Sequence, residues 1–238
     1  MRWTASSRGV TVYSTRMRRS RSAIALAFRD IGRDFHARGW VQGTSGNFSA
    51  VLSRQPLTLA VTASAVSKGA IGLGDVLVIG PSGRVVGKSD RRPSAEALLH
   101  VTVARLCGAG AVLHTHSIWS TILSELHAPQ RGLTLTGYEM LKGLEGVKTH
   151  EHAEWVPILE NDQDMTRLAS LVEETLRQFP AAHGFLLRRH GLYTWGDDLP
   201  QARRHVEIFE FLLEASGRMR TSALAHAGGM HGTGENPR

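Results

Sequence analysis

The apolar residues of this chain recur with two different periods, and the longer period indicates helices. From residue 22 to about 36 they return at every third or fourth position, which places them on one face of a helix that Gly39 ends. A later helix has Asn161 or Asp162 as its expected cap and Pro180 as its stop. Helices are predicted over residues 22–36, 95–107, 117–126, 162–179 and 199–219.

Shorter apolar runs, bounded by glycine, proline or polar residues, are typical of strands. One run ends at His114, and another leads into a turn at His190 and resumes beyond it. Because strands occur singly or as hairpins between helices, we predict a sheet covered by helices on both faces, not an all-parallel one. The other expected strands cover residues 47–52, 57–62, 75–79 and 133–136.

Length and composition favour one domain. The chain has 238 residues, 42% of them apolar, enough for the core of one ordinary domain, which we place at residues 22–222 with a flexible tail over 223–238. The single cysteine, Cys107, excludes a disulfide framework and a cysteine-rich zinc site and fits a reducing cytoplasm. No apolar run is long enough for a membrane span or a signal peptide, so we expect a soluble cytoplasmic protein with no membrane partner.

The basic charge of the chain is concentrated at its N-terminus. Residues 1–21 hold six arginines and no acid, which accounts for +6 of the net charge of +7. This segment lacks apolar periodicity and is expected to be a disordered extension, a translated region upstream of a start at Met17, or a presequence. Since the rest of the chain is nearly neutral, nucleic-acid binding is not expected.

The pair His114-Thr115-His116 is a candidate metal site. Side chains two apart in a strand point to the same face, so both imidazoles can bind one ion. The turn Arg188-Arg189-His190-Gly191 provides a third imidazole after another apolar run. Three imidazoles and one open position are typical of catalytic zinc, although a single His-x-His pair is a weak signal.

Three loops are candidates for binding an anion. Residues 43–47 combine glycines with hydroxyl and amide side chains, residues 64–68 add hydroxyls and one cation, and Ser94 precedes a helix. Each loop alone is equally consistent with a plain turn or cap, but together they favour an anionic substrate. The candidate residues are Thr44, Ser45, Gly46, Asn47, Ser64, Lys68 and Ser94.

Two carboxylates are candidate acid/base groups. Glu96 lies in the first turn of a predicted helix, where complementing the helix dipole is the simpler interpretation. Glu139 lies at no helix start that the sequence supports, which leaves a chemical role open. Beside a divalent metal, a carboxylate can remove a proton next to a polarised carbonyl.

Five segments, in this order, resemble the class II aldolase/adducin superfamily over about residues 23–220. Single motifs are weak, but their ordered combination is specific, and it is most similar to the dehydratases of methionine salvage. The segments are Gly43-Thr44-Ser45-Gly46-Asn47, Pro93-Ser94-Ala95-Glu96, His114-Thr115-His116-Ser117, Glu139-Met140-Leu141-Lys142-Gly143 and Arg189-His190-Gly191-Leu192-Tyr193-Thr194-Trp195-Gly196.

The resemblance implies a class II aldolase-like α/β fold, with three α/β/α layers around a mixed, largely antiparallel sheet. It implies one Zn²⁺ per subunit on His114, His116 and His190, and a homotetramer with active sites at subunit interfaces. Glu139 matches the acid/base glutamate of the dehydratases, and Glu96 matches the metal-proximal glutamate of the sugar-phosphate aldolases.

The same resemblance implies a phosphate site at Asn47, Ser64 and Ser94, with Thr44, Ser45 and Lys68 nearby. Ala65 departs from the pattern, because related enzymes commonly have glycine there.

The implied activity is removal of water from 5-methylthioribulose 1-phosphate, giving 2,3-diketo-5-methylthiopentyl 1-phosphate. A class II aldolase that cleaves a ketose 1-phosphate is the main alternative, because metal, fold and phosphate site are shared. A non-catalytic adducin-like interaction module is a remote alternative, since all three metal ligands are present.

Overall fold

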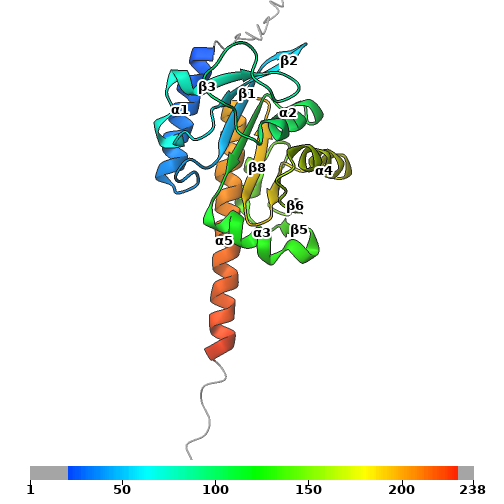
Figure 1. Ribbon diagram of the computed structural model, residues 1–238. Coiled ribbons are helices and arrows are strands. Elements are labelled where there is room, and N and C mark those ends of the chain that lie inside the picture. The colour runs from blue at the N-terminus through cyan, green and yellow to red at the C-terminus, as the bar shows by residue number, and fades with distance from the viewer. Residues whose placement is uncertain (1–20, 230–238) are drawn as a thin grey trace, which may run out of the picture.

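Eight strands form one sheet in residues 21–229, which are the residues that the computed structural model describes (Figure 1). The expected basic extension lies outside this range except for Arg21, which begins the first helix. The strands are β1 (Asn47–Arg54), β2 (Leu57–Thr62), β3 (Val76–Ile79), β4 (Ala111–Thr115), β5 (Gly132–Leu135), β6 (Glu154–Leu159), β7 (Gly184–Leu187) and β8 (Gly191–Gly196). The helices are α1 (Arg21–Ala37), α2 (Ala97–Leu106), α3 (Ile118–Leu126), α4 (Met165–Gln178) and α5 (Leu199–Gly229).

The sheet is mixed and largely antiparallel, as predicted. Its strand order is β3-β2-β1-β4-β8-β7-β6-β5. The pair β6–β7 is parallel, and the other neighbouring pairs are antiparallel.

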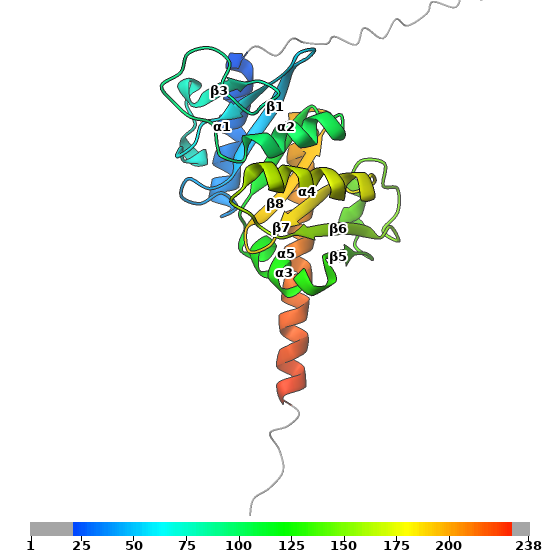
Figure 2. The same ribbon diagram turned by 45° about the vertical axis from the view of Figure 1, so that its right-hand side comes forward.

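Helices cover both faces of the sheet, which confirms the three layers. On one face α1 and α5 pack over the sheet, with Phe28 and Phe35 against Phe48 in one core cluster, and α3 packs beside α5. On the other face, Leu99 of α2 and Val172 of α4 share a cluster with the strands. Figure 2 shows α2 and α4 in front of the sheet and α5 behind it.

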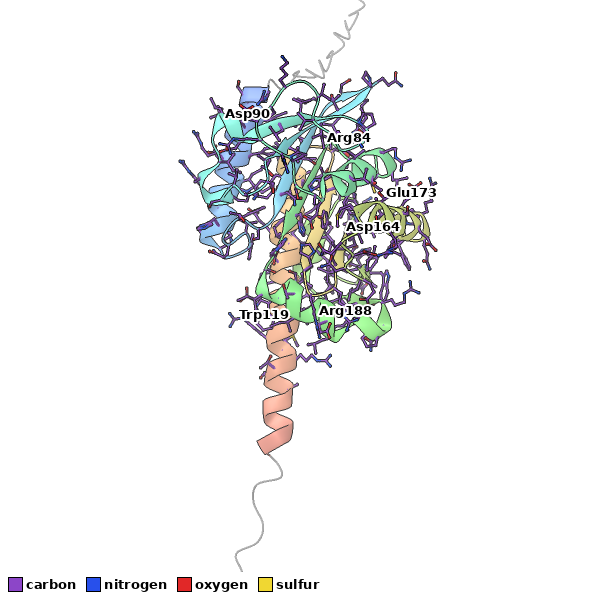
Figure 3. All side chains as sticks on the ribbon, viewed as in Figure 1. Arg84, Asp90, Trp119, Asp164, Glu173 and Arg188 are labelled. Atoms are coloured by element: carbon purple, nitrogen blue, oxygen red, sulfur yellow. The ribbon has the colours of Figure 1, made fainter. Side chains whose placement is uncertain are left out.

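The cap of α3 agrees with the sequence, whereas the starts of α2 and α4 differ. Helix α2 begins at Ala97, two residues later than expected, with Glu96 as its N-cap. Ser117 caps α3 by accepting a hydrogen bond from the Ser120 N–H at 3.1 Å. The cap of α4 is Asp164, seen at the start of that helix in Figure 3, and not Asn161 or Asp162. Asp164 accepts from the N–H groups of Thr166 (2.9 Å) and Arg167 (3.1 Å), because the chain turns into the helix two residues later than expected.

Two elements differ from the sequence prediction. Strand β6 was not predicted, because Pro157 interrupts it and a proline argues against a strand in the interior of a sheet. Helix α5 runs beyond Met219 to Gly229, so the tail expected from residue 223 is helical through Gly229. This helix extends past the rest of the described chain in both views (Figures 1 and 2). Among residues 21–229, a search of the helices finds no candidate for a membrane span.

A row of directly paired residues crosses the middle of the sheet. Asn47 of β1 is paired with His114 of β4, which is paired with Tyr193 of β8. Tyr193 is paired in turn with Phe185 of β7. Cross-strand partners lie on the same face, and here that face is covered by α2. The row therefore brings residues from distant parts of the chain under one helix.

Candidate metal centre and phosphate pocket

Three imidazoles converge at the end of β4. The Nε2 atom of His116 lies 2.7 Å from that of His114 and 3.0 Å from that of His190, and the third Nε2–Nε2 distance is 3.4 Å. Around a tetrahedral zinc ion, ligand nitrogens lie about 3.3 Å apart. Within the described chain, this trio is the cluster of histidine and acidic side chains whose geometry fits a metal ion.

Hydrogen bonding and burial leave these imidazoles ready to bind a cation. The Nδ1–H of the fully buried His114 donates to the Leu192 carbonyl at 2.9 Å, so its Nε2 carries the lone pair. Burial and the neighbouring histidines hold the pKa of His114 well below its usual range. Burial, His190 and Lys68 lower the pKa of His116 to about 3. Neutral imidazoles are the form that binds metal, so the donor set fits zinc.

The turn that carries His190 is held from both sides. Arg189 adopts a left-handed backbone (φ 54°), and its N–H donates to Ser124 Oγ at 3.0 Å. Arg188, labelled next to α3 in Figure 3, forms ion pairs with Glu125 (2.6 Å) and Glu160 (3.0 Å).

Gly191 allows this turn to pack closely against β4. A Cβ at that position would lie 1.9 Å from the Thr115 carbonyl oxygen. The sequence motif Arg-Arg-His-Gly therefore encodes the approach of His190 to the other two ligands.

Glu96 faces the same point as the three histidines. Its Oε1 lies 3.2 Å from His190 Nε2, and its Oε2 lies 3.6 Å from His114 Nε2. Glu96 is the N-cap residue of α2 but makes no side-chain capping hydrogen bond, so its carboxylate is directed at the histidines. Glu96 is therefore a carboxylate next to the candidate metal position.

A pocket of about 310 Å³ opens beside the histidines. Gly46 lines it with φ 70°, and a Cβ there would lie 2.6 Å from the His114 carbonyl oxygen, so glycine is required. Every residue proposed for phosphate binding lines this pocket together with Glu96. The lining is Thr44, Ser45, Gly46, Asn47, Ala63, Ser64, Ala65, Lys68, Ser94, Glu96, His116 and His190.

Lys68 connects two of the predicted anion loops. Its ammonium donates to the Thr44 carbonyl at 2.8 Å and to the Val66 carbonyl at 2.7 Å. Lys68 is 1% exposed, and burial lowers its pKa to about 8. The negative charge of Glu96 raises the pKa, but by less than burial lowers it. Lys68 therefore holds the loops together and supplies positive charge below that pH.

Glu139 is not brought to the pocket within one chain. It begins a short 3-10 helix, η4 (Glu139–Gly143), that packs against α5, and its side chain is 69% exposed. It pairs with Lys142, and that ammonium lowers its pKa. The pocket lining above does not include it.

Two side chains that the sequence prediction left out support the site. Tyr193 is fully buried and stacks on the His114 ring, with centroids 3.9 Å apart and planes at 15°. Burial and the charge of Glu96 raise its pKa. His100 is fully buried and bonds to Ser49 and Asn47. The signal for His100 was its position four residues after Glu96, on the same face of a helix.

Comparisons with known proteins agree with this geometry. A family model described as class II aldolase and adducin N-terminal domain matches residues 27–216. The solved structure of L-fuculose-1-phosphate aldolase from Thermus thermophilus aligns with a TM-score of 0.68 and 26% identity, over 86% of this chain and 98% of that one.

Curated relatives include two bacterial methylthioribulose-1-phosphate dehydratases. The protein from Sorangium cellulosum is 43% identical over 196 residues, which is 82% of this chain and 92% of the relative. The protein from Pseudomonas aeruginosa strain LESB58 is 45% identical over 199 residues, covering 83% and 95% respectively. The chain therefore belongs to the class II aldolase and adducin family and, within it, groups with the methylthioribulose-1-phosphate dehydratases.

Proposed function

We propose that this chain is a zinc-dependent lyase that removes water from 5-methylthioribulose 1-phosphate in methionine salvage, giving 2,3-diketo-5-methylthiopentyl 1-phosphate. The observation that carries the proposal is the convergence of three imidazole Nε2 atoms and Glu96 on one side of a pocket whose other side carries hydroxyls and Lys68. The similarity to dehydratases of that name supports the substrate.

His114, His116 and His190 would hold the metal, one ion per subunit. When bound, zinc supplies positive charge that polarises the C2 carbonyl of the substrate and makes the C3 proton more acidic. Cys107, the single cysteine, lies at the C-cap of α2 and is not part of the cluster. The three imidazoles are therefore the ligands that the chain offers to zinc at this site.

The phosphate of the substrate would lie among the loops of the pocket. Ser64 and Ser94 offer hydroxyl donors, and Lys68 offers positive charge. With the phosphate fixed there, C2 and C3 face the histidines and Glu96. The two ends of the pocket thus orient a ketose 1-phosphate along a single direction.

In the reaction, a base removes the C3 proton, the C3–C4 double bond forms and hydroxide leaves C4 with its bonding electrons. Protonation of the hydroxide completes the loss of water, and the resulting enol at C3 takes up a proton at C4 to become the second ketone. We assign the proton transfers to Glu139. Because Glu139 is exposed and outside the pocket of its own chain, we propose that it reaches the pocket of a neighbouring subunit.

This assignment needs an oligomer, and we propose a homotetramer. Ile118, Ile122 and Leu126 are spaced four apart on α3 and are 71%, 41% and 45% exposed. Met140, next to Glu139, is 38% exposed. An exposed apolar stripe of this kind is typical of a subunit interface, and a second copy of this chain is the occupant that would also complete the active site.

Retro-aldol cleavage of a ketose 1-phosphate is the second candidate. The position of Glu96, 3.2 Å from His190 Nε2, favours it, because this carboxylate can serve as the base without help from another subunit. The cytoplasmic location and the absence of a nucleic-acid partner stay predictions from the sequence. The adducin-like interaction module is disfavoured by the complete set of metal ligands.

Mass spectrometry of the products from 5-methylthioribulose 1-phosphate tests the proposal. The zinc-loaded protein is expected to release water without breaking a carbon–carbon bond. Formation of dihydroxyacetone phosphate would instead establish aldol chemistry and transfer the acid/base role to Glu96. An unchanged substrate would contradict the proposed substrate.

Complementation between two inactive variants tests the shared active site. Glu139→Gln is expected to keep its metal and lose turnover, whereas His116→Ala loses the metal. If Glu139 acts on a neighbouring subunit, mixed oligomers of the two variants regain part of the activity, because some sites combine an intact Glu139 with an intact histidine trio. Near-normal turnover of Glu139→Gln alone would exclude the assignment.

A further inference from the structure

Three buried polar side chains and the partly buried Glu96 form a continuous chain of hydrogen bonds that ends in the pocket. Ser49 and Asn47 come from β1, Glu96 is the residue that precedes α2, and His100 lies in the first turn of that helix. Ser49 Oγ lies 2.8 Å from His100 Nδ1, and His100 Nε2 bonds to Asn47 Oδ1. Asn47 Nδ2 then donates to Glu96 Oε2 at 2.6 Å. Ser49 and His100 are fully buried, and Asn47 is 4% exposed.

The direction of this chain follows from its last member. A carboxylate only accepts hydrogen bonds, so the Asn47 atom facing Glu96 is the amide nitrogen and the amide oxygen faces His100. His100 Nε2 must then carry the hydrogen. Burial lowers the pKa of His100 to about 3, so the ring is neutral and Nδ1 is an acceptor. The Ser49 hydroxyl therefore donates to Nδ1, and every bond points toward Glu96.

The amide of Asn47 also determines what Ser94 can donate. Asn47 Nδ2 lies 3.3 Å from Ser94 Oγ, and the Glu96 N–H lies 3.2 Å from the same oxygen. Because Ser94 Oγ accepts from both, its own hydrogen is left to point into the pocket, where Ser94 is part of the lining. A flipped amide would place its oxygen against Glu96 and draw the Ser94 hydrogen away from the pocket.

We infer that His100 is a positioning residue, which locks the Asn47 amide so that Glu96 is held beside the metal ligands and Ser94 presents its hydroxyl hydrogen to a bound phosphate. The link to substrate rests on the proposed function, but the direction of the hydrogen bonds does not. His100 does not line the pocket itself but contacts Asn47, which does.

The alternative is an ordinary satisfied core histidine, which would stabilise the fold without affecting ligands. The two roles differ at Asn47. A purely structural His100 needs only a partner for each ring nitrogen, in either tautomer. A positioning His100 must keep Nε2 protonated, because the other tautomer would turn the amide around.

Nitrogen-15 NMR of the histidine rings in the zinc-loaded protein tests the direction. Long-range correlations are expected to show His100 protonated at Nε2 and bare at Nδ1 across the neutral pH range. Protonation at Nδ1, or a mixture of the two tautomers, would overturn the inference. This measurement uses no turnover, so a failure of the proposed reaction would leave its result unaffected.

Two variants at His100 test the consequence for anion binding, with inorganic phosphate as the probe and calorimetry on the zinc-loaded protein as the readout. His100→Phe keeps a ring but removes the donor, and we expect phosphate binding to weaken at least about tenfold, the usual scale for such supporting hydrogen bonds. His100→Gln restores an N–H donor and is expected to bind phosphate nearly as the wild type does.

The inference is overturned if His100→Phe and His100→Gln bind phosphate equally well or equally poorly. Should His100→Phe not fold, Ser49→Ala takes its place, because it removes only the donor to Nδ1. The Ser49→Ala protein is expected to show mixed His100 tautomers and weaker phosphate binding. Wild-type affinity together with a single tautomer in that variant would also overturn the inference.

Discussion

The histidines at the two ends of the β7–β8 hairpin differ in what their ring nitrogens face. Where β8 begins, the Nε2 atoms of His114, His116 and His190 face one another. Near the other end, His183 donates from Nδ1 to Glu154 (3.0 Å) and from Nε2 to the Glu145 carbonyl (2.8 Å). The second group has protein partners for its nitrogens, whereas the first has lone pairs directed at a common point.

His205 and His152 complete the second group, which we call the structural histidine cluster: His152, His183 and His205 with Glu154 and Glu145. His205 donates from Nδ1 to the Trp195 carbonyl at 2.7 Å and accepts the Glu145 N–H at 3.1 Å. His152 bonds to the buried Glu154 at 2.8 Å. These bonds fix the segment between η4 and β6, which follows Glu139, onto the sheet and α5.

The pKa of His183 is shifted in the opposite direction from those of the metal-site histidines, whereas burial lowers the pKa of its neighbour His205 to about 4. Burial lowers the pKa of the metal-site histidines, and they lower one another further. Burial also lowers the pKa of His183, but the hydrogen bond and charge of Glu154 outweigh it, and the pKa is raised. Residue type and burial therefore do not identify a ligand; the direction of free lone pairs does.

Removing one histidine from each group should separate them most sharply. His116→Ala is expected to lose bound zinc and to lower turnover by roughly a thousandfold or more, since it removes several kcal/mol of charge stabilisation. His183→Gln should keep its full zinc content by elemental analysis. Loss of zinc from the His183 variant would show that the two groups are not independent.

Breaking the structural histidine cluster should affect stability instead. Glu154→Ala leaves the partly buried His183 without its carboxylate, and loss of these hydrogen bonds costs about 1 to 3 kcal/mol in the free energy of unfolding. Denaturant titration of the zinc-free protein measures this cost. Glu154→Gln, which keeps an acceptor, serves as the matched control and should lose less.

Stability should also depend on pH through His183. Its pKa is raised in the folded protein, so the folded state binds the proton more tightly than the unfolded state does. The resulting stabilisation is complete below the ordinary pKa of 6.5 and is lost as pH rises through the folded value. Melting temperatures of the zinc-free wild type should therefore decline above pH 6.5 more steeply than those of Glu154→Gln.

The pocket itself should respond to pH at a higher value, through Lys68. Because its pKa is about 8, the ammonium loses its proton as pH rises through that value and the pocket loses positive charge. Affinity for inorganic phosphate, which is mostly a dianion from about pH 8 upward, should fall several-fold between about pH 8 and 9. Lys68→Gln should bind phosphate weakly and show a flatter profile; an equally steep decline would assign the effect to another group.

The smallest effect is expected at Ala65, the departure noted in the sequence. Its φ is 58°, a left-handed conformation that costs a residue with a Cβ about 1 kcal/mol. Ala65→Gly should relieve that strain, and the greater freedom of glycine in the unfolded chain offsets part of the gain. Unfolding measurements should thus show a change of less than about 1 kcal/mol, with phosphate affinity retained.

The sequence predicts the metal ligands and the pocket loops better than it predicts the buried side chains that contact them, such as Tyr193 and His100. His114 and His190 stand next to apolar runs and glycines, which are local signals. Tyr193 acts through contacts across strands, which no local pattern contains, and the spacing of His100 from Glu96 does not reveal that it also contacts Asn47 and Ser49 of β1.

Local misses have local reasons. Asp162 is a suitable cap by residue type, but its carboxylate accepts a hydrogen bond from the Arg167 side chain, and Asp164 caps the helix instead. Strand β6 is missed because it contains Pro157, although it is paired with β5 on one side and β7 on the other. Glu139 was a candidate because it lies at no helix start and matches a family motif. Its proposed place in catalysis needs a second chain, which a single sequence describes only by resemblance.

The row Asn47–His114–Tyr193 also makes the site sensitive to the register of the sheet. Sliding β4 by one residue along β8 would turn His114 toward α5 and Thr115 toward the pocket. The buried Glu210 would then lose the Thr115 hydroxyl that now donates to it at 2.6 Å. A metal that binds only the correctly paired strands stabilises that pairing by mass action, so zinc availability during folding would favour the native register over its nearest competitor.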